Sequence, residues 1–126
     1  MPGEYVLWFD ARCSATKRAL ELLRDRGVEP ELRRYLEEPP SEAEISALLA
    51  ALGVEAHAVA RRDEDEYQAL RLSERTPAAE LVAALAAHPR ILDRPILVGG
   101  ERAVIGRPPE RVLELLPPRL GERAAS

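Results

Sequence analysis

The sequence predicts one α/β domain built on a mixed four-stranded sheet with helices on both faces. The chain opens with an apolar strand, a helix and a second strand, and it closes with two short strands and a final helix. Several helical segments lie between these two halves. The length of 126 residues is enough for one modest core. We expect the domain to span residues 1–120 and the small, polar residues 121–126 to form a flexible tail.

The first half begins with the β-rich apolar run of residues 4–9, which predicts a buried strand. Residues 10–12 form a turn, and a helix follows from Ser14 to Arg26, where Gly27 stops it. Residues 31–35 are a second strand candidate. This segment is more polar, so we expect it nearer an edge of the sheet.

The middle of the chain is helical. Ser41 to Glu44 form a capping-box pattern, and apolar residues at helical spacing follow until Gly53 ends the helix. A short helix is expected within residues 63–72, with Tyr67 and Leu70 turned inward and the acidic run 63–66 exposed to solvent. Thr76-Pro77 predicts a further helix with Thr as its cap and Pro at its first position; its inner side carries Leu81, Leu85 and His88.

The second half returns to strands. Residues 96–98 form one strand, Gly99-Gly100 predicts a hairpin turn, and residues 103–105 form the partner. The final helix turns Val112, Leu115 and Leu116 inward. The order is therefore β-α-β, a helical block, then β-β-α. This order resembles the thioredoxin-like plan with a helical insertion between its halves.

Composition excludes several classes of protein. The net charge of −4 is spread along the chain, which is unlike the basic face of a nucleic-acid binder. The N-terminus has neither the positive segment nor the apolar stretch of a signal peptide, and no run approaches the roughly 18 apolar residues of a membrane span. A single cysteine forms no internal disulfide, so we expect a reducing cytoplasm. His57 and His88 lack ligand spacing, and no metal site is predicted.

Cys13, the only cysteine, is the strongest candidate for chemistry. Free cysteine is often a small buried hydrophobe, but this one follows a polar turn at a predicted helix start, where backbone N–H groups stabilise a thiolate. Arg12 and Lys17 add positive charge nearby. Thr16 occupies the second position of a Cys-x-x-Cys motif. Its hydroxyl can hydrogen-bond the sulfur but cannot resolve a mixed disulfide, so a redox cycle needs an external thiol.

A family resemblance rests on the order and spacing of six segments, namely CSATK at 13–17, RYLEEPP at 34–40, LGV at 52–54, RR at 61–62, DRPI at 93–96 and GRPPE at 106–110. From Tyr5 to Leu116 the chain resembles the glutaredoxin/glutathione-coupled arsenate reductases, thioredoxin-like proteins related to Spx-type proteins. The resemblance implies that Cys13 is the nucleophile. It also implies that three arginines, Arg61, Arg94 and Arg107, bind the oxyanion, with Arg62 open as a substitute for Arg61. Guanidinium groups suit a tetrahedral dianion.

The resemblance assigns support of the thiol site to Ser14, Thr16, Lys17 and Pro95, the last in the place of the fold's cis-proline. The family pattern His-Asn-Pro-x-Cys-Gly is replaced here by Phe9-Asp10-Ala11-Arg12-Cys13-Ser14. Asp10 opposes a thiolate and repels an anion unless Arg12 or another cation pairs with it. Lys17 stands where an arginine is usual, which keeps the charge but loses the planar fork.

The expected function is thiol-dependent reduction of arsenate to arsenite, with no bound cofactor. The expected partners are arsenate and an external reductant, either glutathione with glutaredoxin or a thioredoxin-like protein; neither nucleic acid nor membrane is expected. One alternative is a non-enzymatic, Spx-like regulator that binds RNA polymerase, although such proteins usually carry Cys-x-x-Cys. Another is a thiol reductase of the same fold that acts on a different substrate.

Overall fold

The computed structural model describes residues 4–117, so the predicted boundary at residue 120 and the predicted tail lie outside the described residues. The first half holds β1 (Tyr5–Phe9), α1 (Ser14–Asp25) and β2 (Glu31–Arg34). The insertion holds α2 (Glu42–Leu52), the 3-10 turn η1 (Ala56–Val59), α3 (Asp65–Ala69), α4 (Ala78–Ala87) and η2 (Pro89–Ile91). The last part holds β3 (Ile96–Gly99), β4 (Arg102–Ile105) and the 3-10 helix η3 (Pro109–Leu115).

The sheet has four strands in the order β2-β1-β3-β4. β1 runs parallel to β2 and antiparallel to β3, which pairs antiparallel with β4. The mixed sheet, the position of β2 at an edge and the insertion between the two halves confirm the prediction. The polar sequence of β2 matches its edge position, since only Leu32 of its four residues is apolar.

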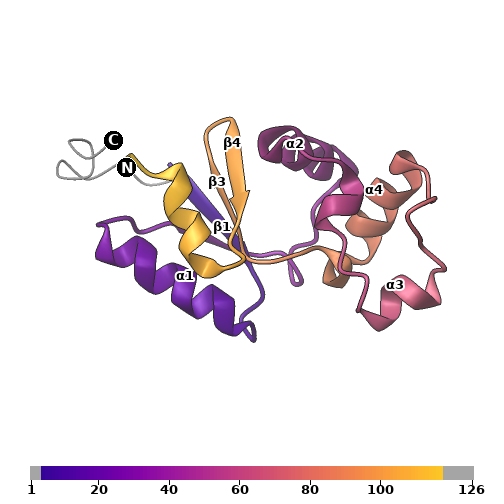
Figure 1. Ribbon diagram of the computed structural model, residues 1–126, viewed down its shortest axis with the longest axis horizontal. Helices are drawn as coiled ribbons and strands as arrows, with labels where there is room; N and C mark the ends of the chain where they lie inside the picture. Colours follow the sequence, from indigo (N-terminus) through magenta and orange to yellow (C-terminus); the bar gives the residue numbers. More distant parts are fainter. Residues whose placement is uncertain (1–3, 118–126) are drawn as a thin grey trace.

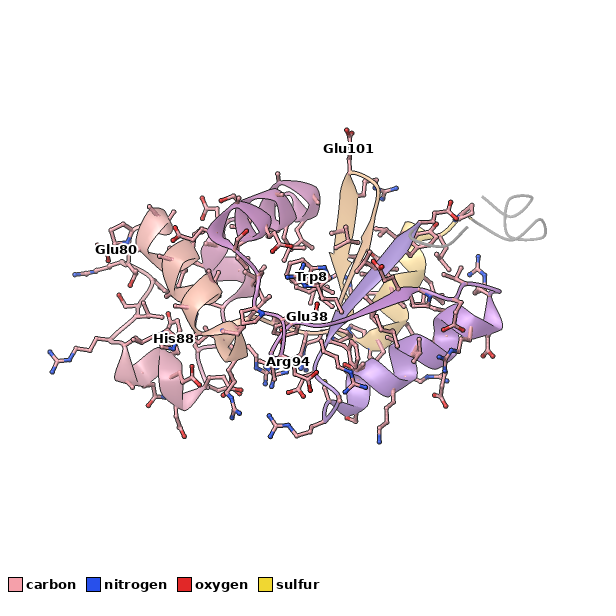
Figure 2. All side chains as sticks on the ribbon, turned by 180° about the vertical axis from the view of Figure 1, so that it is seen from behind. Trp8, Glu38, Glu80, His88, Arg94 and Glu101 are labelled. Atoms are coloured by element: carbon pink, nitrogen blue, oxygen red, sulfur yellow. The ribbon has the colours of Figure 1, made fainter. Side chains whose placement is uncertain are left out.

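Successive side chains of β1 point to opposite faces of the sheet and therefore join two separate parts of the core. Leu7 and Phe9 join a cluster with Leu23 of α1 and Val112 of η3. Trp8 points to the other face and packs with the helical insertion. In Figure 1, α1 and η3 cover one side of the strands, and α2, α3 and α4 lie on the other. Figure 2 shows Trp8 between the strands and the insertion.

Two details of the insertion differ from the prediction. Tyr67 is buried in α3, but Leu70 is 40% exposed because the helix ends at Ala69 and Leu70 follows it as the C-cap. Pro77, not Thr76, is the N-cap of α4, and its carbonyl accepts from the N–H of Leu81 at 3.0 Å. The hydroxyl of Thr76 instead accepts from the N–H of Ser73. His88 ends this helix and contacts Glu66 at 3.2 Å.

The second half differs from the prediction at its hairpin and its last helix. Gly99 pairs with Arg102 inside the sheet, so the turn consists of Gly100 and Glu101, with Gly100 at φ 64°. Gly99 serves packing instead, since a Cβ there would lie 2.8 Å from the Tyr5 ring. The final helix is 3-10 in form and starts at the second residue of a Pro-Pro pair. No helix among residues 4–117 is long and apolar enough to cross a membrane.

Candidate active site

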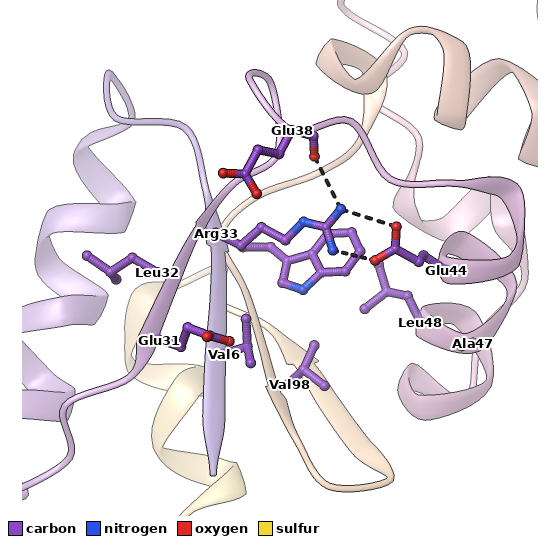
Figure 3. A pocket seen from close by; sticks show the side chains of 10 residues that line it. Val6, Glu31, Leu32, Arg33, Glu38, Glu44, Ala47, Leu48 and Val98 are labelled. Atoms are coloured by element: carbon purple, nitrogen blue, oxygen red, sulfur yellow. Dashed lines mark hydrogen bonds and ion pairs between the residues drawn. The ribbon is translucent and has the colours of Figure 1, made fainter. Parts of the chain in front are cut away.

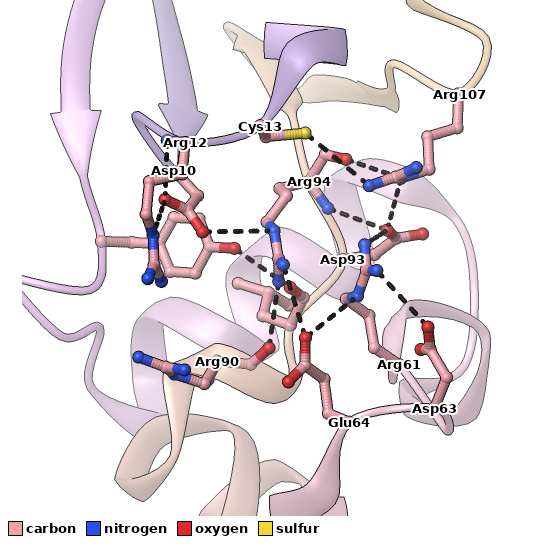
Figure 4. Close-up of polar contacts among 12 residues, drawn as sticks. Asp10, Arg12, Cys13, Arg61, Asp63, Glu64, Arg90, Asp93, Arg94 and Arg107 are labelled. Atoms are coloured by element: carbon pink, nitrogen blue, oxygen red, sulfur yellow. Dashed lines mark hydrogen bonds and ion pairs between the residues drawn. The ribbon is translucent and has the colours of Figure 1, made fainter.

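An open cleft of about 470 Å³ lies at the start of α1. Eight residues line it: Asp10, Arg12, Cys13, Ser14, Ala15, Arg61, Arg94 and Arg107. Figure 4 shows the three arginines approaching from separate segments. Arg61 follows η1 in the insertion, Arg94 precedes β3 and Arg107 follows β4. The fold thus brings the candidate nucleophile and all three candidate anion ligands to one cleft.

The Cys13 thiol sits at the N-cap of α1. Burial alone would raise its pKa. The backbone N–H and hydroxyl of Thr16, the N–H of Ala15 and the charge of Arg107 outweigh that effect and lower the pKa of Cys13 below its ordinary value. The Nη2 of Arg107 lies 3.8 Å from the sulfur. The thiol is therefore biased toward the nucleophilic thiolate.

The residues predicted to support the thiol site lie in different positions relative to the cleft. The buried hydroxyl of Thr16 acts on the Cys13 thiol and has no other hydrogen-bond partner among the described residues. Ser14 lines the cleft, and Pro95 is buried behind a cis Arg94-Pro95 bond. A second cis bond, Arg107-Pro108, was not predicted. Lys17 is exposed and does not line the cleft.

Arg94 and Arg107 are held by several partners each. The Nε of Arg107 donates to Oδ1 of Asp93 at 2.9 Å and to the carbonyl of Arg94 at 2.8 Å. The side chain of Arg94 is only 12% exposed. It donates to the carbonyl of Arg90 at 3.1 Å and to Glu64 at 3.4 Å. Both guanidinium groups are thus oriented before any ligand arrives.

Arg61, rather than Arg62, faces the cleft. Its mostly buried side chain lies 3.6 Å from Asp93 and 3.7 Å from Glu64. Its buried Nε, like that of Arg94, has no hydrogen-bond partner among the described residues. Arg62 is 54% exposed and pairs with Glu74. Of the two arginines left open by the sequence, only Arg61 lines the cleft.

Asp10 is buried beside the arginines, which offset its negative charge near the thiol. Its Oδ1 accepts the N–H of Arg12 at 3.0 Å, and its Oδ2 lies 3.7 Å from the Nε of Arg94. Burial works to raise the pKa of Asp10, but the N–H and charge of Arg12 and the charge of Arg94 prevail and lower it. Asp10 is thus an ionised carboxylate whose charge is compensated.

Two site residues were missed from the sequence, Glu64 and Asp93. Glu64 belongs to the acidic run interpreted as a solvated face, yet its side chain is only 21% exposed and bridges Arg61 and Arg94. Asp93 bridges Arg61 and Arg107. The available signal was the direct adjacency of Asp93 to Arg94. Among residues 4–117, no group of three His, Cys, Asp or Glu could hold a metal ion.

A lowered-pKa thiol beside oriented guanidinium groups can attack an anionic electrophile whose charge the arginines neutralise. Phosphate, sulfate and arsenate are tetrahedral anions of this kind. The geometry alone does not choose among them.

Comparison with known proteins supplies the family. The ArsC family model matches residues 9–115. The chain is 39% identical over 118 residues to the uncharacterised protein YfgD of Escherichia coli (strain K12), covering 92% of this chain and 99% of that protein. It is 34% identical over 113 residues to an arsenate reductase of Haemophilus influenzae, covering 88% of this chain and 97% of that protein.

A solved structure agrees with this similarity. The arsenate reductase from Vibrio cholerae matches with a TM-score of 0.87 at 37% identity, covering 92% of this chain and all of that one (100%). The family model spans most of the chain, and the similarity extends over nearly the whole length of both relatives. The resemblance seen in the sequence is thereby confirmed, and this chain belongs to the ArsC family.

Proposed function

We propose that this protein is an enzyme that reduces arsenate to arsenite with electrons from an external thiol. The observation that carries the proposal is the placement of the Arg107 guanidinium 3.8 Å from the Cys13 sulfur, in a cleft that Arg61 and Arg94 also line. The names of the ArsC-family relatives support the choice of arsenate among the tetrahedral anions.

In the first step, the Cys13 thiolate attacks arsenic. A sulfur–arsenic bond forms, and one arsenate oxygen takes up two protons and leaves as water. The thiolate is favoured by the groups that lower its pKa. Arg61, Arg94 and Arg107 offset the negative charge of the oxyanion and orient it for attack.

In the second step, an external thiolate attacks the Cys13 sulfur. A disulfide bond forms, the sulfur–arsenic bond breaks, and its electron pair stays on arsenic, which leaves as arsenite. A further thiol then releases Cys13 by disulfide exchange. The external partner is required because Cys13 is the only cysteine of the chain. We propose glutathione with glutaredoxin, or a thioredoxin-like dithiol protein, as the source of these thiols.

The test is thiol-dependent arsenite production by purified variants. Cys13→Ser should abolish turnover, and Arg94→Ala or Arg107→Ala should each lower it by about 10²-fold, the loss typical of one charge-stabilising donor. Arg62→Ala is the matched control, because that side chain is exposed and pairs with Glu74 outside the cleft. Full turnover by Cys13→Ser would overturn the proposal. Running the assay with glutaredoxin or with thioredoxin identifies the reductant.

A second candidate is a thiol reductase that acts on another substrate. The observation in its favour is the pairing of Asp10 with Arg94, which offsets positive charge that an oxyanion would use. A titration of Cys13 alkylation with arsenate, phosphate and sulfate separates the candidates. Selective protection by arsenate supports the arsenate reductase, and no protection by any of the three supports the second candidate. A regulator with an internal dithiol switch gains no support, since Thr16 supplies no sulfur.

A further inference from the structure

Asp93 places a carboxylate in the middle of the arginine cluster, where a negative charge opposes the binding of an anion. Its Oδ1 lies 2.9 Å from the Nε of Arg107 and 3.6 Å from the Nη1 of Arg61. The same oxygen accepts the backbone N–H of Arg94 at 2.9 Å. One carboxylate oxygen therefore lies near donors from Arg61, Arg94 and Arg107, three of the four arginines that line the cleft.

We propose that Asp93 is a positioning residue, which holds the Arg107 guanidinium at the Cys13 sulfur and ties Arg61 to the same cluster. It acts through the arginines and makes no contact with the sulfur itself. The inference deepens the proposed function, because it names what orients the groups that receive the oxyanion. The effect of Asp93 on Arg107 and on the thiol, however, can be measured without arsenate and is tested separately from the proposed function.

The Asp93 side chain is well placed for this task because its backbone and that of the preceding residue are anchored to the insertion. Its N–H donates to the carbonyl of Val59 at 2.8 Å. The preceding residue, Leu92, is fully buried and pairs with Ala60 in an isolated β-bridge. Asp93 thus presents its carboxylate from a fixed point on the wall between the insertion and β3.

Arg107 needs such an anchor more than the other two arginines. Its side chain is 40% exposed, whereas those of Arg94 and Arg61 are 12% and 19% exposed. A long exposed side chain samples many rotamers, and ordering it costs conformational entropy. The Nε contact to Asp93, with the carbonyl of Arg94, orders the guanidinium and leaves its Nη2 facing Cys13 (Figure 4).

The experiment compares Asp93→Ala with Asp93→Asn. Both variants remove the negative charge, but only asparagine keeps an oxygen that accepts from Arg107 and from the N–H of Arg94. Two quantities are measured on each purified variant. One is the pH profile of Cys13 alkylation by iodoacetamide, which reports the thiol pKa without any substrate; the other is protection of Cys13 by arsenate. The exposed Glu29→Ala is the control, since Glu29 pairs with Arg24 outside the cleft.

We expect Asp93→Asn to keep the wild-type profile or shift it to lower pH, since a negative charge is gone. Asp93→Ala should have a profile at higher pH than Asp93→Asn and need about 10-fold more arsenate for the same protection. In an Arg107→Ala background, the two variants should give the same alkylation profile. Equal profiles with Arg107 present, or a difference that persists without it, would overturn the proposal. Absence of arsenate protection in the wild type would instead count against the proposed function.

Thermal unfolding of each variant checks that the fold is intact. If Asp93→Ala does not fold, Asp93→Ser serves in its place, because its hydroxyl is too short to span to Arg107 while still able to accept the N–H of Arg94. The comparison with Asp93→Asn and the Arg107→Ala background remain the same. A serine variant with the profile of Asp93→Asn would overturn the proposal as well.

Discussion

Asp10 shows how a carboxylate that opposes formation of a nearby thiolate is accommodated beside the arginines. It lies three positions before Cys13, buried and ionised, and it pairs with the guanidinium of Arg94, one of the proposed anion ligands. The arginine-rich cleft is therefore less positive than its arginines alone would make it. We expect the balance between the arginines and the carboxylates of Asp10, Glu64 and Asp93 to set how strongly the site attracts an oxyanion.

Asp10→Asn should strengthen oxyanion binding and lower the pKa of the Cys13 thiol. Asparagine keeps an oxygen for the N–H of Arg12 but removes the charge that competes for Arg94. A partly screened charge at this range is worth about 1 kcal/mol, so we expect arsenate protection at about 3- to 10-fold lower concentration. The measurement is the titration of Cys13 alkylation against arsenate. Asp25→Asn, at the exposed end of α1, is the control; weaker protection in Asp10→Asn would contradict the prediction.

The strand β2 and the helix α2 are joined by an ion pair at the edge of a second groove. Arg33 of β2 pairs with Glu44 of α2, with Nη2 to Oε1 at 3.2 Å, and its guanidinium lies 4.6 Å above the Trp8 ring. Glu44 also completes the capping box with Ser41. Figure 3 shows this contact at a groove of about 560 Å³ between the sheet and α2. The pair links the helical insertion to the first half of the chain.

Glu44→Gln should destabilise the fold in a pH-dependent way. The hydrogen bond from Arg33 and the N–H of Ser41 hold the pKa of Glu44 at about 2, below its ordinary value of 4.5. A depressed pKa contributes stability that is complete above the unfolded-state value and is lost as pH falls toward the folded-state value. Because the side chain is 44% exposed, solvent screens the pair, and we expect a loss of about 1 kcal/mol at pH 7.

The measurement is urea unfolding of wild type and Glu44→Gln across the acid range. Glutamine keeps the capping-box geometry, so the difference isolates the charge. The gap should be constant from pH 7 to about 5 and should close as pH falls from about 4.5 to about 2. Glu42→Gln, in the same first turn, is the matched control, because Glu42 is exposed and takes no part in the capping box. A gap that widens on acidification would refute the argument.

Most elements were predictable from the sequence because their signals are local. The apolar run of β1, the capping box of α2 and Gly53 in the left-handed C-cap conformation at φ 70° are each set by neighbouring residues. The predictions were wrong where contacts between distant segments determine the local structure. Gly99 is a strand residue because it pairs with Tyr5 of β1 and with Arg102 of β4, and no local pattern at the hairpin reveals the pairing with Tyr5.

The candidate site shows the same contrast between local sequence signals and contacts that form only in the folded molecule. Cys13, Arg94 and Arg107 were predictable from the thiol at a helix start and from the family resemblance. The carboxylates between the arginines were not, because the Glu64–Arg94 and Asp93–Arg61 pairs form only when the insertion packs beside the segment that precedes β3. The network is a product of tertiary structure, since it joins segments that are distant in sequence.

That origin predicts that anion binding stabilises the whole molecule. The cleft is built from the first half, the insertion and the last part of the chain, so a bound oxyanion has no comparable site in the unfolded chain. At a concentration 100 times the dissociation constant, the ligand should add about 2.7 kcal/mol, which corresponds to a rise in Tm of roughly 10 °C. The transition should remain single, because the ligand bridges all three segments.

The measurement is thermal unfolding with arsenate against chloride at matched ionic strength. Cys13→Ser should retain the rise in Tm, since binding by the arginines needs no covalent step, whereas the Arg94→Ala/Arg107→Ala double variant should lose most of it. Arg62→Ala should behave as wild type, because its side chain pairs outside the cleft. An equal rise in the double variant would show that arsenate acts elsewhere. A transition that splits in two would show that the insertion unfolds independently of the sheet, contrary to a site shared between them.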